Sequence, residues 1–101
     1  MSERTLGQVA QKIRSKNAGP FWLTIDIFCG TNEAYKMITA SLKTEMVAAY
    51  LKSDATHIKR FDMKELRVVK FSLPRPQTQG ARTDRDMHGA SFAALMADIT
   101  L

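Results

Sequence analysis

The chain has 101 residues, a formal net charge of +5 and one cysteine, and its residues are 45% hydrophobic, 25% charged and 8% aromatic. This composition predicts one small globular domain over residues 1–101 and excludes collagen-like, coiled-coil and wholly disordered chains. No apolar run is long enough for a membrane span, and residues 1–5 do not open a secretory signal, so we expect a cytoplasmic protein. A single cysteine excludes an intramolecular disulfide and a cysteine metal cluster.

Positive charge is concentrated in residues 57–76, which hold six basic and two acidic residues. Such a stretch attracts nucleic acid, a phosphorylated cofactor such as a coenzyme A thioester, or an acidic partner. It is also typical of a solvated sheet face with Lys and Arg alternating outward, and we favour this interpretation. The aromatic residues lie mostly inside apolar runs and are expected in the core, which makes nucleic-acid binding less favoured.

The first predicted element is a short amphipathic helix over residues 6–14. Thr5 and Gln8 fit a capping box, and apolar residues follow at helical spacing. Residues 14–20 are dense in polar and turn-forming residues, which predicts a loop. Residues 21–28 are apolar at alternate positions and largely apolar between them, which predicts a central strand.

Helices are expected next at residues 31–40, capped by Thr31 or Asn32, and from Thr44 onward, with Tyr50 among the residues facing inward. Residues 57–63 and 66–73 read as two short strands. The turn between them, at Lys64-Glu65, is short enough for an antiparallel hairpin.

The last predicted elements are a polar loop over residues 77–87, a short helix over residues 90–96, and an edge strand containing Ile99 and Leu101. After the first helix, the order is strand, helix, strand, strand, helix, strand. We therefore expect the α+β class: a ferredoxin-like βαββαβ sandwich with a four-stranded antiparallel sheet and an extra N-terminal helix. Right-handed crossovers place the helices on one face of that sheet.

The most unusual local string is Arg14-Ser15-Lys16-Asn17-Ala18-Gly19. It offers two cations, a hydroxyl, an amide and flexible backbone, which together suit a carboxylate, a phosphate or the carbonyl groups of a partner. From the residues alone we favour a structural interpretation. In it, the basic side chains complement the end of a helix, while asparagine and glycine make the turn.

Three further residues are candidates for chemistry. Arg75 stands between two prolines and projects from a defined place, which suits the binding of an acid and equally a stiff strand exit. His88 follows two aspartates closely and is a candidate base, but the two histidines lack metal-ligand spacing, so no metal site is expected. Cys29 is expected to be buried rather than nucleophilic. No cofactor-binding motif is present, so no cofactor is expected.

The string Arg14 to Pro20 is the most specific part of a wider resemblance. Together with residues 6–10 and 23–28, it resembles the opening of a family of short bacterial proteins of unknown function. The likeness continues through Pro74-Arg75-Pro76 and His88-Gly89-Ala90 to the last residues, so that it covers nearly the whole chain.

This family resembles, more distantly, the C-terminal ferredoxin-like domain of the acyclic terpene utilisation (AtuA-type) proteins. That domain opens with a comparable helix and an Arg-Ser-Gly-Asp-Lys-Gly string. Arg14, Ser15 and Gly19 match the string in kind, whereas Lys16 and Asn17 depart from it in charge and backbone freedom. A role that depends on the aspartate of that string is therefore not carried over.

The resemblance implies an AtuA-like ferredoxin-fold domain whose partner is a large AtuA-type subunit encoded in the same gene cluster. Such clusters resemble pathways for acyl-CoA and organic acids. We therefore expect the small subunit of a heteromeric enzyme that acts on an acyl-CoA or carboxylate, by hydration, dehydration or a lyase reaction. Residues 14–19, with Arg75 and His88, would contribute at the interface. The alternative is a self-associating ligand-binding or regulatory module without catalysis, such as a homodimer, and nucleic-acid binding through residues 57–76 ranks third.

Overall fold

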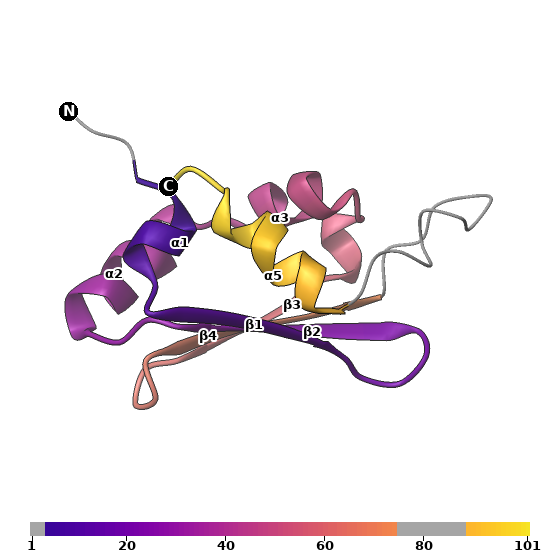
Figure 1. Cartoon of the computed structure of the whole chain (residues 1–101), viewed down its shortest axis with the longest axis horizontal. Coiled ribbons are helices and arrows are strands. Elements are labelled where there is room, and N and C mark those ends of the chain that lie inside the picture. The colour runs from indigo at the N-terminus through magenta and orange to yellow at the C-terminus, as the bar shows by residue number, and fades with distance from the viewer. Residues whose placement is uncertain (1–3, 75–88) are drawn as a thin grey trace.

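In the part of the chain that the structure describes, a four-stranded antiparallel sheet carries helices on one face only (Figure 1). The computed structural model describes residues 4–74 and 89–101. The expected α+β class is confirmed, and the arrangement is compatible with a ferredoxin-like fold with an extra N-terminal helix. The elements in chain order are α1 (Leu6–Val9), β1 (Lys12–Asn17), β2 (Trp22–Phe28), α2 (Asn32–Ser41), α3 (Thr44–Leu51), the 3-10 turn η1 (Ala55–His57), β3 (Lys59–Met63), β4 (Val68–Pro74) and α5 (Gly89–Ala97).

Two hairpins build the sheet, whose strand order is β1-β2-β4-β3. The strand predicted at residues 21–28 is confirmed as β2 and is central. The predicted antiparallel pairing of residues 57–63 with residues 66–73 is confirmed as β3 and β4. Their turn has four residues rather than two, and Arg67 in it adopts a left-handed backbone with φ 53°. The two edges of the sheet are therefore β1 and β3.

The N-terminal helix starts as predicted but ends much earlier. The Thr5 hydroxyl accepts a hydrogen bond from the Gln8 backbone, and the Gln8 amide oxygen accepts one from the Thr5 backbone, which completes the capping box. The helix nevertheless ends at Val9, and residues 12–17 form β1, so the prediction of a helix to residue 14 is wrong. The predicted loop over residues 14–20 is wrong for residues 14–17 and confirmed for residues 18–20, which form the turn between β1 and β2. Backbone pairing of the whole of β1 with β2 outweighs the helical spacing of the apolar residues.

The predicted C-terminal edge strand is also wrong, because β1 already occupies that side of β2. Residues 99–101 lie instead against the start of α1, with one isolated bridge between Thr5 and Thr100. The Leu6 amide donates to the Ile99 carbonyl over 2.7 Å, and the Leu101 amide donates to the Arg4 carbonyl over 2.8 Å. The two ends of the described chain are thereby fastened together.

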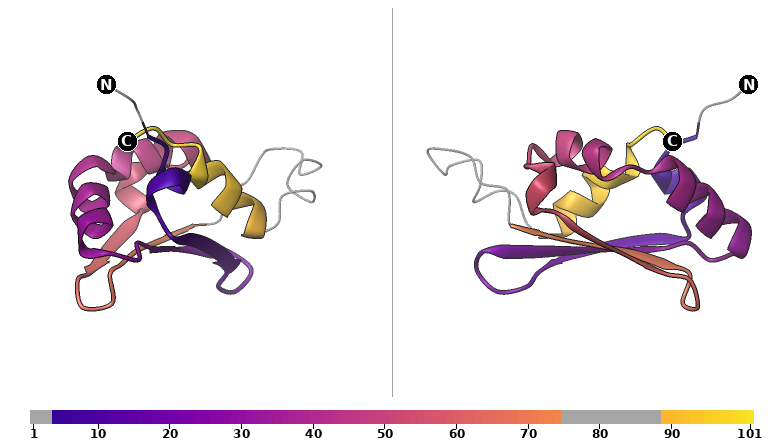
Figure 2. Two further views of the ribbon diagram at one scale, coloured as in Figure 1. Left: turned by 60° about the vertical axis from the view of Figure 1, so that its left-hand side comes forward. Right: turned by 180° about the vertical axis from the view of Figure 1, so that it is seen from behind.

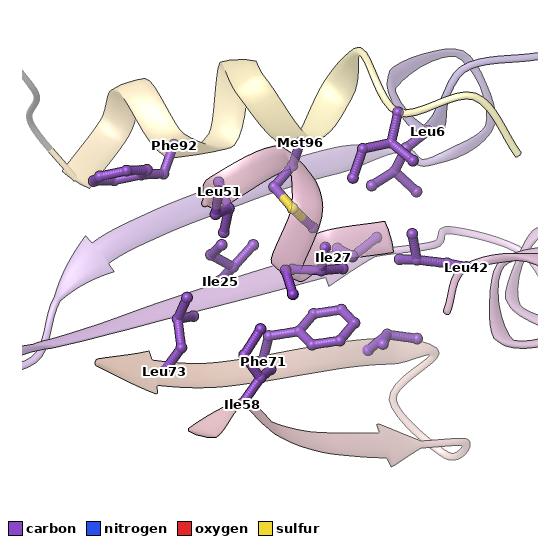
Figure 3. Packing of buried hydrophobic residues seen from close by; sticks show 14 of the residues in the cluster. Leu6, Ile25, Ile27, Leu42, Leu51, Ile58, Phe71, Leu73, Phe92 and Met96 are labelled. Atoms are coloured by element: carbon purple, nitrogen blue, oxygen red, sulfur yellow. The ribbon is translucent and has the colours of Figure 1, made fainter. Parts of the chain in front are cut away.

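The core lies between the helices and the inner side of β2 and β4 (Figure 3). Six fully buried side chains of these two strands meet buried side chains of α1, α2, α3 and α5 there. Burial of each large aliphatic or aromatic side chain contributes about 1.5–3 kcal/mol. The strand residues are Leu23, Ile25, Ile27, Val69, Phe71 and Leu73, and the helix residues include Leu6, Ile38, Val47, Leu51, Phe92 and Met96.

The helices lie close to where the sequence places them. Thr31 caps α2 as predicted, because its hydroxyl accepts from the Ala34 amide over 3.0 Å. α3 begins at Thr44, and α5 covers the predicted residues 90–96, but Tyr50 is exposed and does not face inward. The longest helix among the described residues, α2, has ten residues, and none of these helices is long and apolar enough to cross a membrane.

Arg60 fastens the end of α2 to the edge strand β3. Its guanidinium donates to the carbonyl oxygens of Leu42 and Thr39, at 2.6 and 3.1 Å, and to the Asp62 carboxylate at 2.8 Å. It also lies 5.8 Å from the centre of the Phe71 ring. The terminal carbonyls of a helix have no partner inside the helix, so a cation placed there satisfies them and complements the helix dipole.

We predict that Arg60→Ala lowers the free energy of unfolding by about 2–3 kcal/mol, because it leaves two partly buried carbonyls without a charged donor. Urea unfolding followed by circular dichroism measures this change. The matched control is Lys59→Ala, the neighbouring exposed cation, whose effect should stay within about 0.5 kcal/mol. Equal losses in the two variants would contradict the role given to Arg60.

Candidate functional site

The helices leave one side of the sheet uncovered, and we call this side the open face (Figure 2). Directly paired residues of neighbouring antiparallel strands point to the same side, so the strand register identifies its members. They are Lys12, Arg14 and Lys16 of β1, Trp22, Thr24, Asp26 and Phe28 of β2, Val68, Lys70, Ser72 and Pro74 of β4, and Lys59, Phe61 and Met63 of β3.

The open face is strongly cationic. The described strand residues contribute five Lys or Arg side chains and one carboxylate, that of Asp26, to this face. The register places Asp26 between Arg14 on one neighbouring strand and Lys70 on the other. The basic stretch 57–76 contributes only part of this charge, since Arg60 points to the helices. The favoured interpretation of that stretch, with basic residues alternating outward, therefore fits Lys59 and Lys70 but not Arg60.

Aromatic side chains are interleaved with these cations. Trp22 is 42% exposed and Phe61 is 47% exposed, while Phe28 is half-buried. The prediction that these residues belong to the core is therefore wrong, although it holds for Phe71, which is fully buried. Strand alternation is the reason, because it sends Trp22 and Phe28 to the side opposite the buried leucine and isoleucines of β2.

The structure divides the predicted cationic string between the two sides of β1. Arg14 and Lys16 are exposed on the open face, whereas Ser15 and Asn17 pair in register with covered residues of β2. The Ser15 hydroxyl accepts a hydrogen bond from the Ala93 amide of α5 over 3.0 Å. Ser15 therefore helps to hold α5 over β1, and only the two cations point away from the helices.

Of the other predicted site residues, the structure describes Gly19 but not Arg75 or His88. Gly19 lies in the turn between β1 and β2 with φ +84°, a conformation that glycine adopts at little cost, and its surroundings are open. Arg75 and His88 lie outside the described residues.

One corner of the open face is hollowed. Gln11, Lys12, Arg14 and Phe28 line an open depression of about 350 Å³. Two cations and an amide can bind a carboxylate or a phosphate, and the Phe28 ring offers a flat apolar surface beside them. A second depression, of about 310 Å³, lies on the other side of the same strand end, between α1, β1 and α5, and Gln11 and Lys12 also line it.

Three members of this corner, Gln11, Lys12 and Phe28, were not among the predicted site residues. The signal that would have found Lys12 is the alternation of cations at positions 12, 14 and 16, which has the period of a strand. This alternation was overlooked because Ile13 also fits the helical spacing of apolar residues that starts at Leu6, and residues 12–14 were therefore assigned to a helix. The signal for Phe28 is weaker: it shares its side of the strand with Thr24 and Asp26, which are more polar than the residues between them.

Cys29 is buried, as expected, with 2% of its surface exposed. Burial raises the pKa of its thiol to about 11, and the Asp62 carboxylate adds to this shift. The thiol is therefore protonated at neutral pH, a state in which it is a poor nucleophile. Among the described residues, no three His, Cys, Asp or Glu side chains are grouped so that they could hold a metal ion.

The raised pKa of Cys29 predicts a loss of stability at alkaline pH. The unfolded chain releases the thiol proton near pH 9.0, whereas the folded chain holds it up to about pH 11, so the free energy of unfolding falls between these values. Urea unfolding of the wild type and of Cys29→Ala between pH 8 and 11 measures this fall. The variant should lose less stability than the wild type over this range, and parallel curves would contradict the shift.

Comparison with known proteins gives one finding on the family. A family model described as a domain of unknown function, DUF4387, matches residues 6–100. No curated protein and no solved structure matches the chain. The matched range runs from the first residue of α1 to Thr100, so that it contains both hairpins, every described helix and the corner lined by Gln11 and Phe28.

Proposed function

The chain belongs to the family of domains of unknown function DUF4387, and we propose that it works as the small subunit of a heteromeric enzyme. The large chain is an AtuA-type subunit, the partner that the resemblance of the sequence implies. The substrate is an acyl-CoA or another organic acid, and the reaction is a hydration, a dehydration or a lyase reaction. The small subunit supplies cationic binding groups to a site that the two chains share.

The observation that carries this proposal is the incomplete anion-binding site at the N-terminal end of β1. Lys12 and Arg14 stand beside Gln11 and Phe28 in a depression that is open to solvent. Sites for small molecules bury most of the surface of their ligand. A second wall is therefore needed, and a larger chain seated on the open face would provide it.

The chemistry of this corner agrees with the proposed substrate class. The planar guanidinium of Arg14 matches the geometry of a carboxylate or a phosphate, and Lys12 adds a compact positive charge. An acyl-CoA carries phosphate groups, and an organic acid carries a carboxylate, so either ligand offers an anion to these two side chains. This binding role does not require a catalytic group in the small subunit.

A self-associating module without catalysis is the alternative function. Two copies of the chain that met through their open faces would set five cations against five cations. Like charges that face one another across an interface cost several kcal/mol. The open face therefore argues for a different partner rather than for a second copy.

The proposal predicts that the chain and an AtuA-type large subunit elute as one complex after co-expression. In that complex, Arg14→Ala should lower turnover of an acyl-CoA or organic acid by about 10- to 100-fold, because one charged hydrogen-bonding group is lost. The fold should persist, since Arg14 is exposed, and the complex should still form, because four of the five cations of the open face and the exposed Trp22 and Phe61 remain. Size-exclusion chromatography and a panel of unsaturated acyl-CoA thioesters and carboxylic acids provide the measurements.

The matched control for this experiment is Lys36→Ala, an exposed cation on α2 that lies away from the open face. It should change neither assembly nor turnover. Separate elution of the two chains, together with full activity of the large chain alone, would overturn the proposed function. Equal turnover of the Arg14 and Lys36 variants would overturn the binding role of Arg14.

A further inference from the structure

We infer that the open face of the sheet is the surface on which the larger subunit docks, and that this subunit presents an acidic surface with apolar pockets. The inference rests on the proposed function and adds to it the contact surface and the chemistry of the partner. Two independent features of the described residues support it: where the exposed apolar side chains gather, and which charge surrounds them.

Four of the six large apolar side chains that are exposed among the described residues lie on the open face or in the hairpin turns beside it. Trp22 and Phe61 stand on the open face itself, and Phe21 and Leu66, which are 66% and 68% exposed, lie in the two hairpin turns at its opposite ends. Figure 1 shows both turns bending away from the helices, so that they frame the open face. Clusters of large exposed apolar side chains mark interaction surfaces, and aromatic residues carry much of the binding energy there.

The charge of the open face selects the kind of partner. Five cations surround a single carboxylate, so the matching surface must carry a net negative charge. A second copy of this chain does not meet that requirement. Electrostatic attraction would also speed the encounter of the two subunits, and salt would slow it.

A protein fits the open face better than a single-stranded nucleic acid does. The Asp26 carboxylate lies between Arg14 and Lys70 in the sheet register, where it would repel a phosphate backbone that crossed the strands. Met63, half-buried, and the exposed Leu66 are aliphatic, and nucleobases stack on aromatic rings instead. A protein surface can match this mixture of aromatic, aliphatic and charged side chains.

Docking on the open face would also complete the anion-binding site at the N-terminal end of β1. Phe28, Lys12 and Arg14 belong both to this face and to the depression at its corner. A subunit seated over β1 and β2 would cover the depression from the solvent side. One surface would then serve both assembly and ligand binding, with the aromatic residues for the first and the corner cations for the second.

The experiment compares surface variants in the complex with the large subunit. Trp22→Ser and Phe61→Ser should each raise the Kd for the large subunit by about tenfold or more, and Lys70→Glu should do the same. The Kd of the wild type should rise with salt. Circular dichroism of each variant checks that the fold is kept, which we expect because both aromatic side chains are exposed.

The matched controls are Met37→Ser and Tyr50→Ser. These side chains are 40% and 42% exposed, as much as Trp22, but they belong to α2 and α3 on the helical side. They should leave the Kd within about twofold of the wild type. Isothermal titration calorimetry at two salt concentrations measures all of these values.

The outcomes separate the two proposals. If the wild-type complex forms and the open-face variants bind as tightly as the controls, the docking surface is overturned and the small-subunit function stands. If no complex forms, both proposals fail. Two further measurements would identify the other occupants. Concentration-dependent dimerisation that Trp22→Ser abolishes would assign the face to a second copy, and retardation of a single-stranded oligonucleotide at low salt would assign it to nucleic acid.

Discussion

Apolar packing on one side of the sheet is the constraint on which the rest of this structure depends. Ile25 of β2 and Phe71 of β4 are fully buried beneath the helices, and their neighbours along each strand must then point to the other side. The same packing that fixes the core therefore fixes the positions of Trp22 and Lys70. The binding surface that we propose follows from the core. Successive side chains of a strand point to opposite sides of the sheet, so burial of one residue puts the next on the open face.

The one-sided core also sorts the basic residues into two roles. Arg60 turns toward the helices, where backbone carbonyls and Asp62 satisfy its guanidinium. Its neighbour Lys59 turns to the open face, as does Lys70 on the adjacent strand. A count of charges along residues 57–76 cannot separate these roles, because adjacent residues of one strand point to opposite sides of the sheet. Arg60 stabilises the fold, whereas Lys59 adds charge to the open face.

Signals that act over a few residues explain what the sequence predicted well. The alternation in residues 21–28, the capping threonine at position 31 and the short connection between β3 and β4 each specify local structure. β1 was missed because it is mostly polar and because contacts outside it stabilise it: the pairing with β2, which follows it in the chain, and the packing of α5, which lies far along the chain. Local spacing favoured a helix there, and tertiary pairing overrode it.

Local signals also identified part of the candidate site, whereas the residues that tertiary structure brings to it were not predicted. Arg14 and Lys16 stood out as a rare cationic pair, and the structure puts both on the open face. Phe28 and Trp22 were not assigned to that face, although Thr24 and Asp26 make it the more polar side of their strand. The two aromatic rings obscured this alternation, because they make both sides of the strand largely apolar.

The pairing of Thr5 with Thr100 has a consequence for how this domain can be attached to another polypeptide. Residues 4–6 and 99–101 meet on the helical side of the sheet, and Figure 1 shows this place well away from the open face. A peptide tether leaving from either segment would start on the far side of the molecule. It would have to wrap around an edge of the sheet before it could hold a fused neighbour against Trp22 and Phe61.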